Sequence, residues 1–92
     1  MSSIKYFLSL LNTINHSLDL ENDCGDIKLG SINLNKDSFI TDDLGDIEIG
    51  NTNEIYIDAK TSLGNVKINK NYNKSDVTLK IENDCGDIKV KN

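Results

Sequence analysis

Short stretches in which apolar and polar residues alternate recur along most of the chain. The clearest of them contain Leu18 and Leu20, Ile57 and Ala59, and Val77, Leu79 and Ile81. Alternation with a period of two is typical of a strand that buries one face. Each stretch runs into a short polar turn and then into a second alternating stretch, as at Ile27 and Leu29. The pattern therefore predicts pairs of short strands joined by tight turns.

One seven-residue segment, from Asp23 to Leu29, occurs in four related copies. The other copies begin at Asp43, Ser62 and Asp84, and all four have glycine at the third position. These glycines stand 20, 19 and 22 residues apart, from 25 to 45, 45 to 64 and 64 to 86. A nearly constant period of this length indicates a stacked-repeat fold. We therefore expect an all-β, right-handed parallel β-solenoid of about four coils over residues 17–92.

The repeated glycines are expected where the chain turns between the two strands of a coil. A backbone with positive φ tolerates glycine far better than any residue with a Cβ. Asp or Asn beside the glycine bonds the free N–H groups of the turn. We therefore assign structural turn roles to Gly25, Gly45, Gly64 and Gly86.

Stacking of the coils predicts that equivalent residues form columns. One inward column is expected from Cys24, Leu44, Leu63 and Cys85, and another from Ile27, Ile47, Val66 and Ile88. On the outer face the stack is expected to contain Lys28, Glu48, Lys67 and Lys89, of which the first three alternate in charge.

Residues 1–16 lie before the repeats and form a separate N-terminal segment. Helical spacing is present at Ile4, Phe7, Leu8, Leu11 and Ile14. Strand-like alternation is present at Ile4, Tyr6, Leu8 and Leu10, so both structures stay open, with helix slightly favoured. In either form we expect the segment to cover the first coil, because the end of a solenoid exposes unpaired backbone.

The charge and the apolar content of the chain argue against several classes of function. The net charge of −5 leaves no basic face for nucleic acid or for anionic lipid. No apolar run is long enough to insert in a membrane. No small-residue cleavage site follows the first apolar run, so the chain as written is expected in the cytoplasm.

The four Gly-Asp-Ile or Gly-Asn-Val corners, each preceded by a polar turn, resemble the bacterial adhesin-type family of β-solenoid domains of unknown function. The resemblance extends from about Leu18 to Val90. It implies a right-handed parallel β-solenoid, association with the cell envelope and no established catalytic residues.

Two groups of acidic residues suggest a cation site. One consists of Asp23, Asp43 and Asp84, and the other of Asp26, Asp46 and Asp87. Stacked carboxylates repel each other, and Ca²⁺ relieves that repulsion. The third copy of the motif is neutral at both positions, which leaves only the first two coils to supply neighbouring acids. The candidate calcium ligands are therefore Asp23, Asp26, Asp43 and Asp46.

The two cysteines and the single histidine do not form a recognisable reactive site. If the coils stack in sequence order, Cys24 and Cys85 stand three coils or about 14 Å apart, too far for a disulfide. His16 has no Cys-x-x-Cys partner for zinc, and no catalytic triad or phosphate-binding motif is present. We expect no enzymatic activity and no cofactor other than calcium.

The last motif strand ends the chain and predicts an open final coil. Its apolar residues are Ile81, Cys85, Ile88 and Val90. Unpaired strand edges at this coil favour association with a second copy. The function favoured is a non-catalytic binding or scaffold module with a protein or envelope partner. The alternatives are a self-assembling structural solenoid and a calcium-dependent adhesion module.

Overall fold

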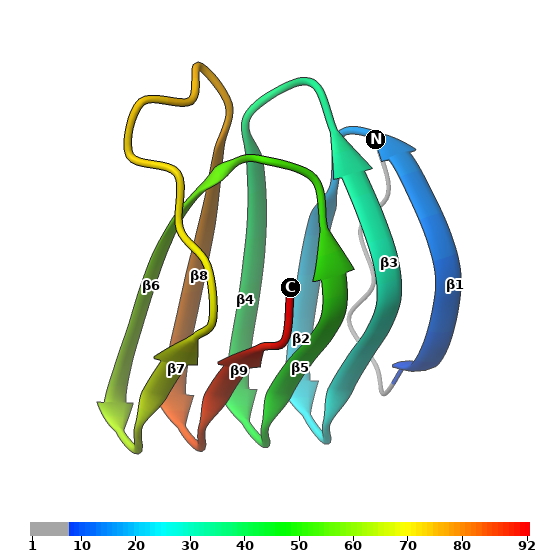
Figure 1. Ribbon diagram of the computed structural model, residues 1–92. Coiled ribbons are helices and arrows are strands. Elements are labelled where there is room, and N and C mark those ends of the chain that lie inside the picture. The colour runs from blue at the N-terminus through cyan, green and yellow to red at the C-terminus, as the bar shows by residue number, and fades with distance from the viewer. Residues whose placement is uncertain (1–7) are drawn as a thin grey trace.

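The computed structural model describes the backbone of residues 8–92 and the side chains of residues 17–92. The described chain folds into nine strands in two facing sheets, and every strand pair is parallel (Figure 1). The strands are β1 (Leu8–His16), β2 (Asp19–Cys24), β3 (Ile27–Leu34), β4 (Ser38–Leu44), β5 (Ile47–Thr52), β6 (Tyr56–Leu63), β7 (Val66–Ile68), β8 (Thr78–Cys85) and β9 (Ile88–Val90). The predicted parallel β-solenoid is therefore confirmed.

Each motif copy joins one strand of the first sheet to one strand of the second. Coil 1 consists of β2 and β3, coil 2 of β4 and β5, coil 3 of β6 and β7, and coil 4 of β8 and β9. The strand orders are β2-β4-β8-β6 and β1-β3-β5-β9-β7. Coil 4, the last in sequence, therefore lies between coils 2 and 3, as Figure 1 shows.

This order makes the expected open C-terminal coil wrong. Ile81 and Ile88 are 0 % exposed and Val90 is 1 % exposed, because coil 4 has a neighbour on each side. Cys85 is half-buried between Leu44 and Leu63, its register partners on the two neighbouring strands. The described solenoid ends at coil 3 instead.

One core position favours coil 4 over coil 3 inside the stack. Coil 3 has Ala59 at the position where coil 4 has Ile81. At this position, placing isoleucine rather than alanine between two neighbouring coils removes more apolar surface from water. The connection over residues 69–77 is long enough to bring β8 back past β6.

The N-terminal segment forms a strand where the structure describes it. Residues 8–16 make up β1, which pairs in parallel with β3, so the favoured helix is wrong over this range. The predicted helical positions Ile4 and Phe7 lie outside the described residues.

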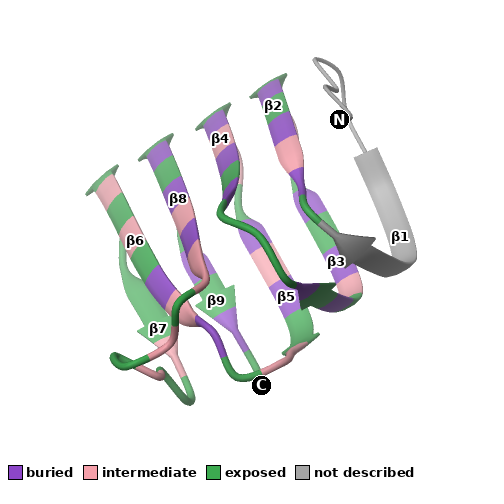
Figure 2. Cartoon of the chain, turned by 90° about the horizontal axis from the view of Figure 1, so that it is seen from above, coloured by how far each residue is buried: buried purple, intermediate pink, exposed green. Residues whose placement is uncertain are grey.

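The core lies between the two sheets, and buried residues alternate with more exposed ones along the strands, as predicted (Figure 2). Buried residues include Leu18, Leu20, Ile40, Ile57, Leu79 and Ile81, while Ala59 and Val77 are partly buried. Val66 lies in register with the buried Ile88, in the predicted column, but it is 41 % exposed because coil 3 ends the stack.

Asparagine side chains replace the backbone ladder where a neighbouring strand has ended or is absent. Asn53 Oδ1 accepts a hydrogen bond from Leu34 N–H at 3.0 Å, and its Nδ2 donates to Leu34 O at 2.8 Å. Asn71 bonds the N–H and C=O of Ile57 in the same way, at 2.8 and 2.9 Å. These amides satisfy strand groups that would otherwise be left without a protein partner.

Candidate functional site

The four motif glycines form one corner of the solenoid, where each coil passes from one sheet to the other. Their φ angles are 113° at Gly25, 137° at Gly45, 151° at Gly64 and 133° at Gly86, which confirms the predicted positive φ. A Cβ added at Gly45 would lie 2.2 Å from Gly25 O, and one at Gly86 would lie 2.0 Å from Gly45 O. Glycine is therefore required both for the turn and for close stacking of the turns.

A ladder of aspartates runs beside these glycines. The Asp26 Oδ1 atom accepts a hydrogen bond from Asp46 N–H, and Asp46 Oδ1 accepts one from Asp87 N–H, each at 2.9 Å. Asp87 Oδ1 accepts the last one from Asn65 N–H, also at 2.9 Å. Each carboxylate thus joins its own coil to the next one. Asn65 lies in coil 3, which ends the ladder within the described residues.

The structure changes the arrangement expected for a calcium site. Acids were expected side by side only in coils 1 and 2, but coil 4 lies next to coil 2 and adds Asp84 and Asp87. Asp26 and Asp46 each use one carboxylate oxygen in the ladder. Asp23 and Asp43 are exposed. Within residues 17–92, no three His, Cys, Asp or Glu side chains are grouped closely enough to hold a metal ion.

The residues that precede the glycines form a row along the outside of the corner. We name Cys24, Leu44, Cys85 and Leu63, in their spatial order, the corner row. Leu44 is 51 % exposed and Leu63 is 69 % exposed, so the expected inward column is wrong. Alternation along β2 would place Cys24 inside, after Leu20 and Asn22. At this point, however, the chain has entered the corner, and Cys24 is exposed and free.

The inward side of the same turns has a column of polar side chains. Register aligns Asn22, Asp42, Asn83 and Thr61. Asn22 Nδ2 donates to Gly25 O at 2.9 Å, Asn83 Nδ2 donates to Gly45 O at 2.8 Å, and Thr61 Oγ1 donates to Gly86 O at 2.8 Å. Asp42 is 2 % exposed, and its carboxyl oxygens have no hydrogen-bond partner among the described residues.

Burial is the main cause that raises the pKa of the Asp42 carboxyl, from 3.8 to about 7. The charges of Asp26 and Asp43 raise this pKa further. The nearby N–H groups of Leu44 and Asp43, which do not reach hydrogen-bond geometry with the carboxyl, lower it by less. The Oδ1 atoms of Asn22 and Asn83 are also without partners, so acceptors lie on both sides of the carboxyl. The sequence-based prediction missed this position. The feature of the sequence that distinguishes Asp42 is the tripeptide before Leu44, which is Thr-Asp-Asp in coil 2 and Glu-Asn-Asp at the equivalent place in coils 1 and 4.

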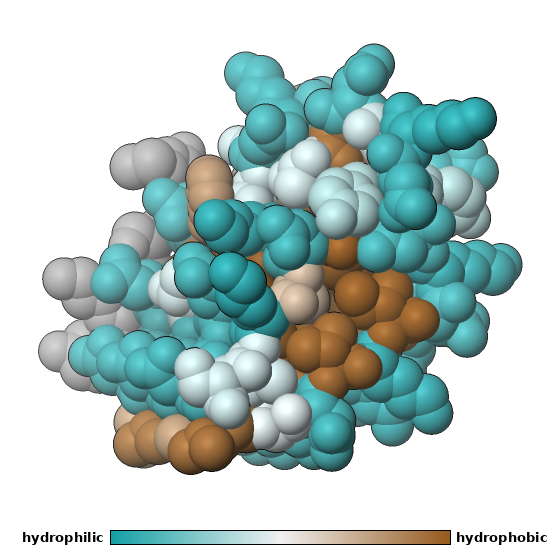
Figure 3. Space-filling model, turned by 90° about the vertical axis from the view of Figure 1, so that its left-hand side faces the viewer, coloured by the Kyte–Doolittle hydropathy of each residue, from teal (hydrophilic) through white to brown (hydrophobic). Residues whose placement is uncertain are grey.

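The end formed by coil 3 exposes both sheets. Strands β6 and β7 are the last strands of their sheets, and each has a strand partner on one side only. Leu63 and Val66 are exposed there, while Ala59, Ile68 and Val77 are partly buried. Figure 3 looks onto this side of the molecule and shows apolar areas surrounded by polar ones.

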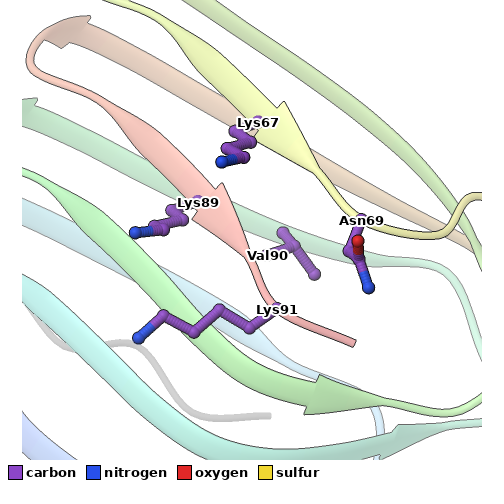
Figure 4. A pocket seen from close by; sticks show the side chains of 5 residues that line it. All are labelled: Lys67, Asn69, Lys89, Val90 and Lys91. Atoms are coloured by element: carbon purple, nitrogen blue, oxygen red, sulfur yellow. The ribbon is translucent and has the colours of Figure 1, made fainter.

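A basic hollow of about 300 Å³ lies where the short strands β7 and β9 end (Figure 4). It is lined by Lys67, Asn69, Lys89, Val90 and Lys91. Lys91 Nζ lies 3.2 Å from Glu48 Oε1. The outer column reads Lys28, Glu48, Lys89 and Lys67 in space, so the expected alternation holds only with Lys89 as its third member. Positive charge thus collects on the face of the five-stranded sheet, away from the acidic corner.

A family model described as Toastrack DUF4097 matches residues 8–92. No curated protein and no solved structure matches the chain. In residues 8–92 we find no helix that is both long and apolar enough to cross a membrane. The family match agrees with the β-solenoid and names no activity.

Proposed function

We propose, given that the chain belongs to the Toastrack family, that this protein is a non-catalytic scaffold module that pairs with a second copy through the end formed by coil 3. The observation that carries the proposal is the pair of free strand edges at this end, one in each sheet. The sequence predicted association through coil 4, the C-terminal coil. The proposal places it at coil 3, which ends the described stack.

The side chains at this end support association. Leu63 is 69 % exposed and Val66 is 41 % exposed, which is unusual for apolar residues beside an unpaired edge. The edge of β6 is already occupied at Ile57, where Asn71 bonds both backbone groups. The surface offered to a partner is therefore the part of coil 3 nearest the glycine corner.

The symmetry of a pair follows from the parallel sheets. A two-fold axis perpendicular to the solenoid axis reverses the strand direction, so the edges of two copies meet antiparallel. Each copy then covers the apolar residues of the other. The contact is about as large as the cross-section of one coil, which is at the low end for specific interfaces, and we expect weak to moderate affinity.

Sedimentation equilibrium from micromolar to near-millimolar concentration tests the proposal. Val66→Lys places a charge at the centre of the contact and should leave a folded monomer at every concentration. The matched control is Phe39→Lys, since Phe39 is 50 % exposed on β4, away from this end. This control should associate as the wild type does. A wild type that stays monomeric, or a Val66→Lys variant that still pairs, would refute the proposal.

A further inference from the structure

We infer that the corner row is a docking surface for a basic amphipathic helix of another protein. The inference is independent of the pairing proposed above, because it concerns the side of the stack and not its end. The two surfaces share only Leu63.

The corner row is apolar and held in place by the fold; Cys24, Leu44 and Leu63 are exposed, and Cys85 is half-buried. Cys24 pairs in register with Leu44, Leu44 with Cys85, and Cys85 with Leu63, so one such residue stands on every coil. Strands in a sheet lie about 4.8 Å apart, which gives the row a length of about 14 Å. The glycine turns and the aspartate ladder fix the corner beneath it. A partner therefore meets a preformed surface and loses little free energy to ordering it.

Charge on both sides of the row selects the partner. Exposed acids precede it at Asp23, Asp43 and Asp84 and follow it at Asp26, Asp46 and Asp87. A two-fold contact between two corners would bring these acids together, which disfavours a second copy at this surface. Anionic lipid is repelled for the same reason. An apolar stripe bordered by Lys or Arg has the complementary charge.

The spacing of the row favours a helix over a strand. Residues on one face of a helix follow each other after three or four positions, which is a rise of about 4.5 or 6.0 Å. Two such steps, seven residues, rise about 10.5 Å, against about 9.6 Å for two steps along the row. Same-face residues of a strand are about 6.7 Å apart, so two steps reach about 13 Å and do not match the spacing of the row. A helix of roughly ten residues therefore contacts all four coils.

Two synthetic helical peptides test the inference. Both have leucines at the same helical positions, and the leucines are flanked by lysines in one peptide and by glutamates in the other. Binding is followed by fluorescence anisotropy at low and high salt. The key variant is Leu44→Ser, and Phe39→Ser is its matched control, because the two residues are 51 % and 50 % exposed and both lie in β4.

The lysine peptide should bind saturably, with an affinity that falls as salt increases. Leu44→Ser should weaken this binding about fivefold or more, since half of a leucine side chain remains to be buried. Phe39→Ser and the Val66→Lys variant should bind as the wild type does, which separates this surface from the coil 3 end. No saturable binding of the lysine peptide, equal binding of the glutamate peptide, or equal losses in Leu44→Ser and Phe39→Ser would each overturn the inference.

Discussion

Replacing Asp42 by asparagine should stabilise this protein at neutral pH, although Asp42 is a buried residue directly before the motif. Asp42 lies between Asn22 and Asn83 in a column whose free atoms are all acceptors. An ionised carboxylate adds two more acceptors and a charge. An amide at this position carries no charge and adds N–H donors for the Oδ1 atoms of Asn22 and Asn83. The substitution therefore supplies the hydrogen-bond donors that the column lacks.

The size of the expected gain in unfolding free energy follows from the pKa of Asp42. A rise from 3.8 to about 7 corresponds to roughly 4 kcal/mol at most. The turn lies close to solvent, and local relaxation lowers the cost, so we expect a gain of roughly 2 kcal/mol for Asp42→Asn. The raised pKa also determines how the stability of the protein changes with pH. Below pH 3.8 the carboxyl is protonated in both states and costs nothing. As pH rises, the unfolded state releases the proton first, so stability falls, and above about pH 7 the cost is complete.

Urea unfolding followed by circular dichroism at several pH values measures this effect as the difference between variant and wild type. The difference should be small near pH 4 and should level off above pH 7. Asp84→Asn, at an exposed turn position of coil 4, serves as the control and should show no comparable trend. A gain that does not change with pH, or an Asp42→Asn variant less stable than the wild type at pH 8, would refute the reasoning.

Two further substitutions test the corner. Gly45→Ala should cost more than about 3 kcal/mol of unfolding free energy or prevent folding, since its Cβ would lie 2.2 Å from Gly25 O at a positive φ. Its control is Ser31→Ala, on the exposed face of β3. A Gly45→Ala variant that loses little stability would contradict the close stacking. Asp87→Ala removes the acceptor for Asn65 N–H and should cost about 1 kcal/mol in the same urea assay. Asp84→Ala should stay within about 0.5 kcal/mol, and equal losses in the two variants would argue against the ladder.

The sequence predicts the unit of this fold well because the unit depends on local rules. Alternation at Leu18 and Leu20, or at Leu79 and Ile81, requires one buried face, and the glycine corners require positive φ. These features are repeated four times, so errors in one copy do not affect the interpretation of the rest. The parallel stack follows from the period alone.

The order of the coils could not be derived in the same way. Chain order was assumed to be spatial order, and that assumption placed Ile88 and Val90 at an open end. A signal for the true order was nevertheless present in the motif. Each ladder aspartate accepts a hydrogen bond from an N–H group of the next coil. Only the coil at the end of the stack needs no aspartate at this position, because no further coil follows it. That coil is the one with Asn65 where the other three copies have aspartate.

The outward turn of Cys24 and Leu44 was missed for a different reason. Alternation predicts direction only while the backbone stays extended, and the strand ends within a residue of these positions. Asp42 was overlooked because the exposed acids on either side of it suggested a solvated turn. Its burial depends on the stacking of three coils, which a single motif copy does not reveal.

The position of coil 4 has a consequence for how the protein is made. A ribosome releases β6 and β7 before β8 and β9, yet β8 and β9 are their only strand partners among the described residues. While residues 69–90 are still being translated, coil 3 lacks its final strand partners, and coil 2 presents the surface that coil 4 will later occupy. Coil 3 can therefore make its strand pairs of the finished fold only after β8 and β9 have been made.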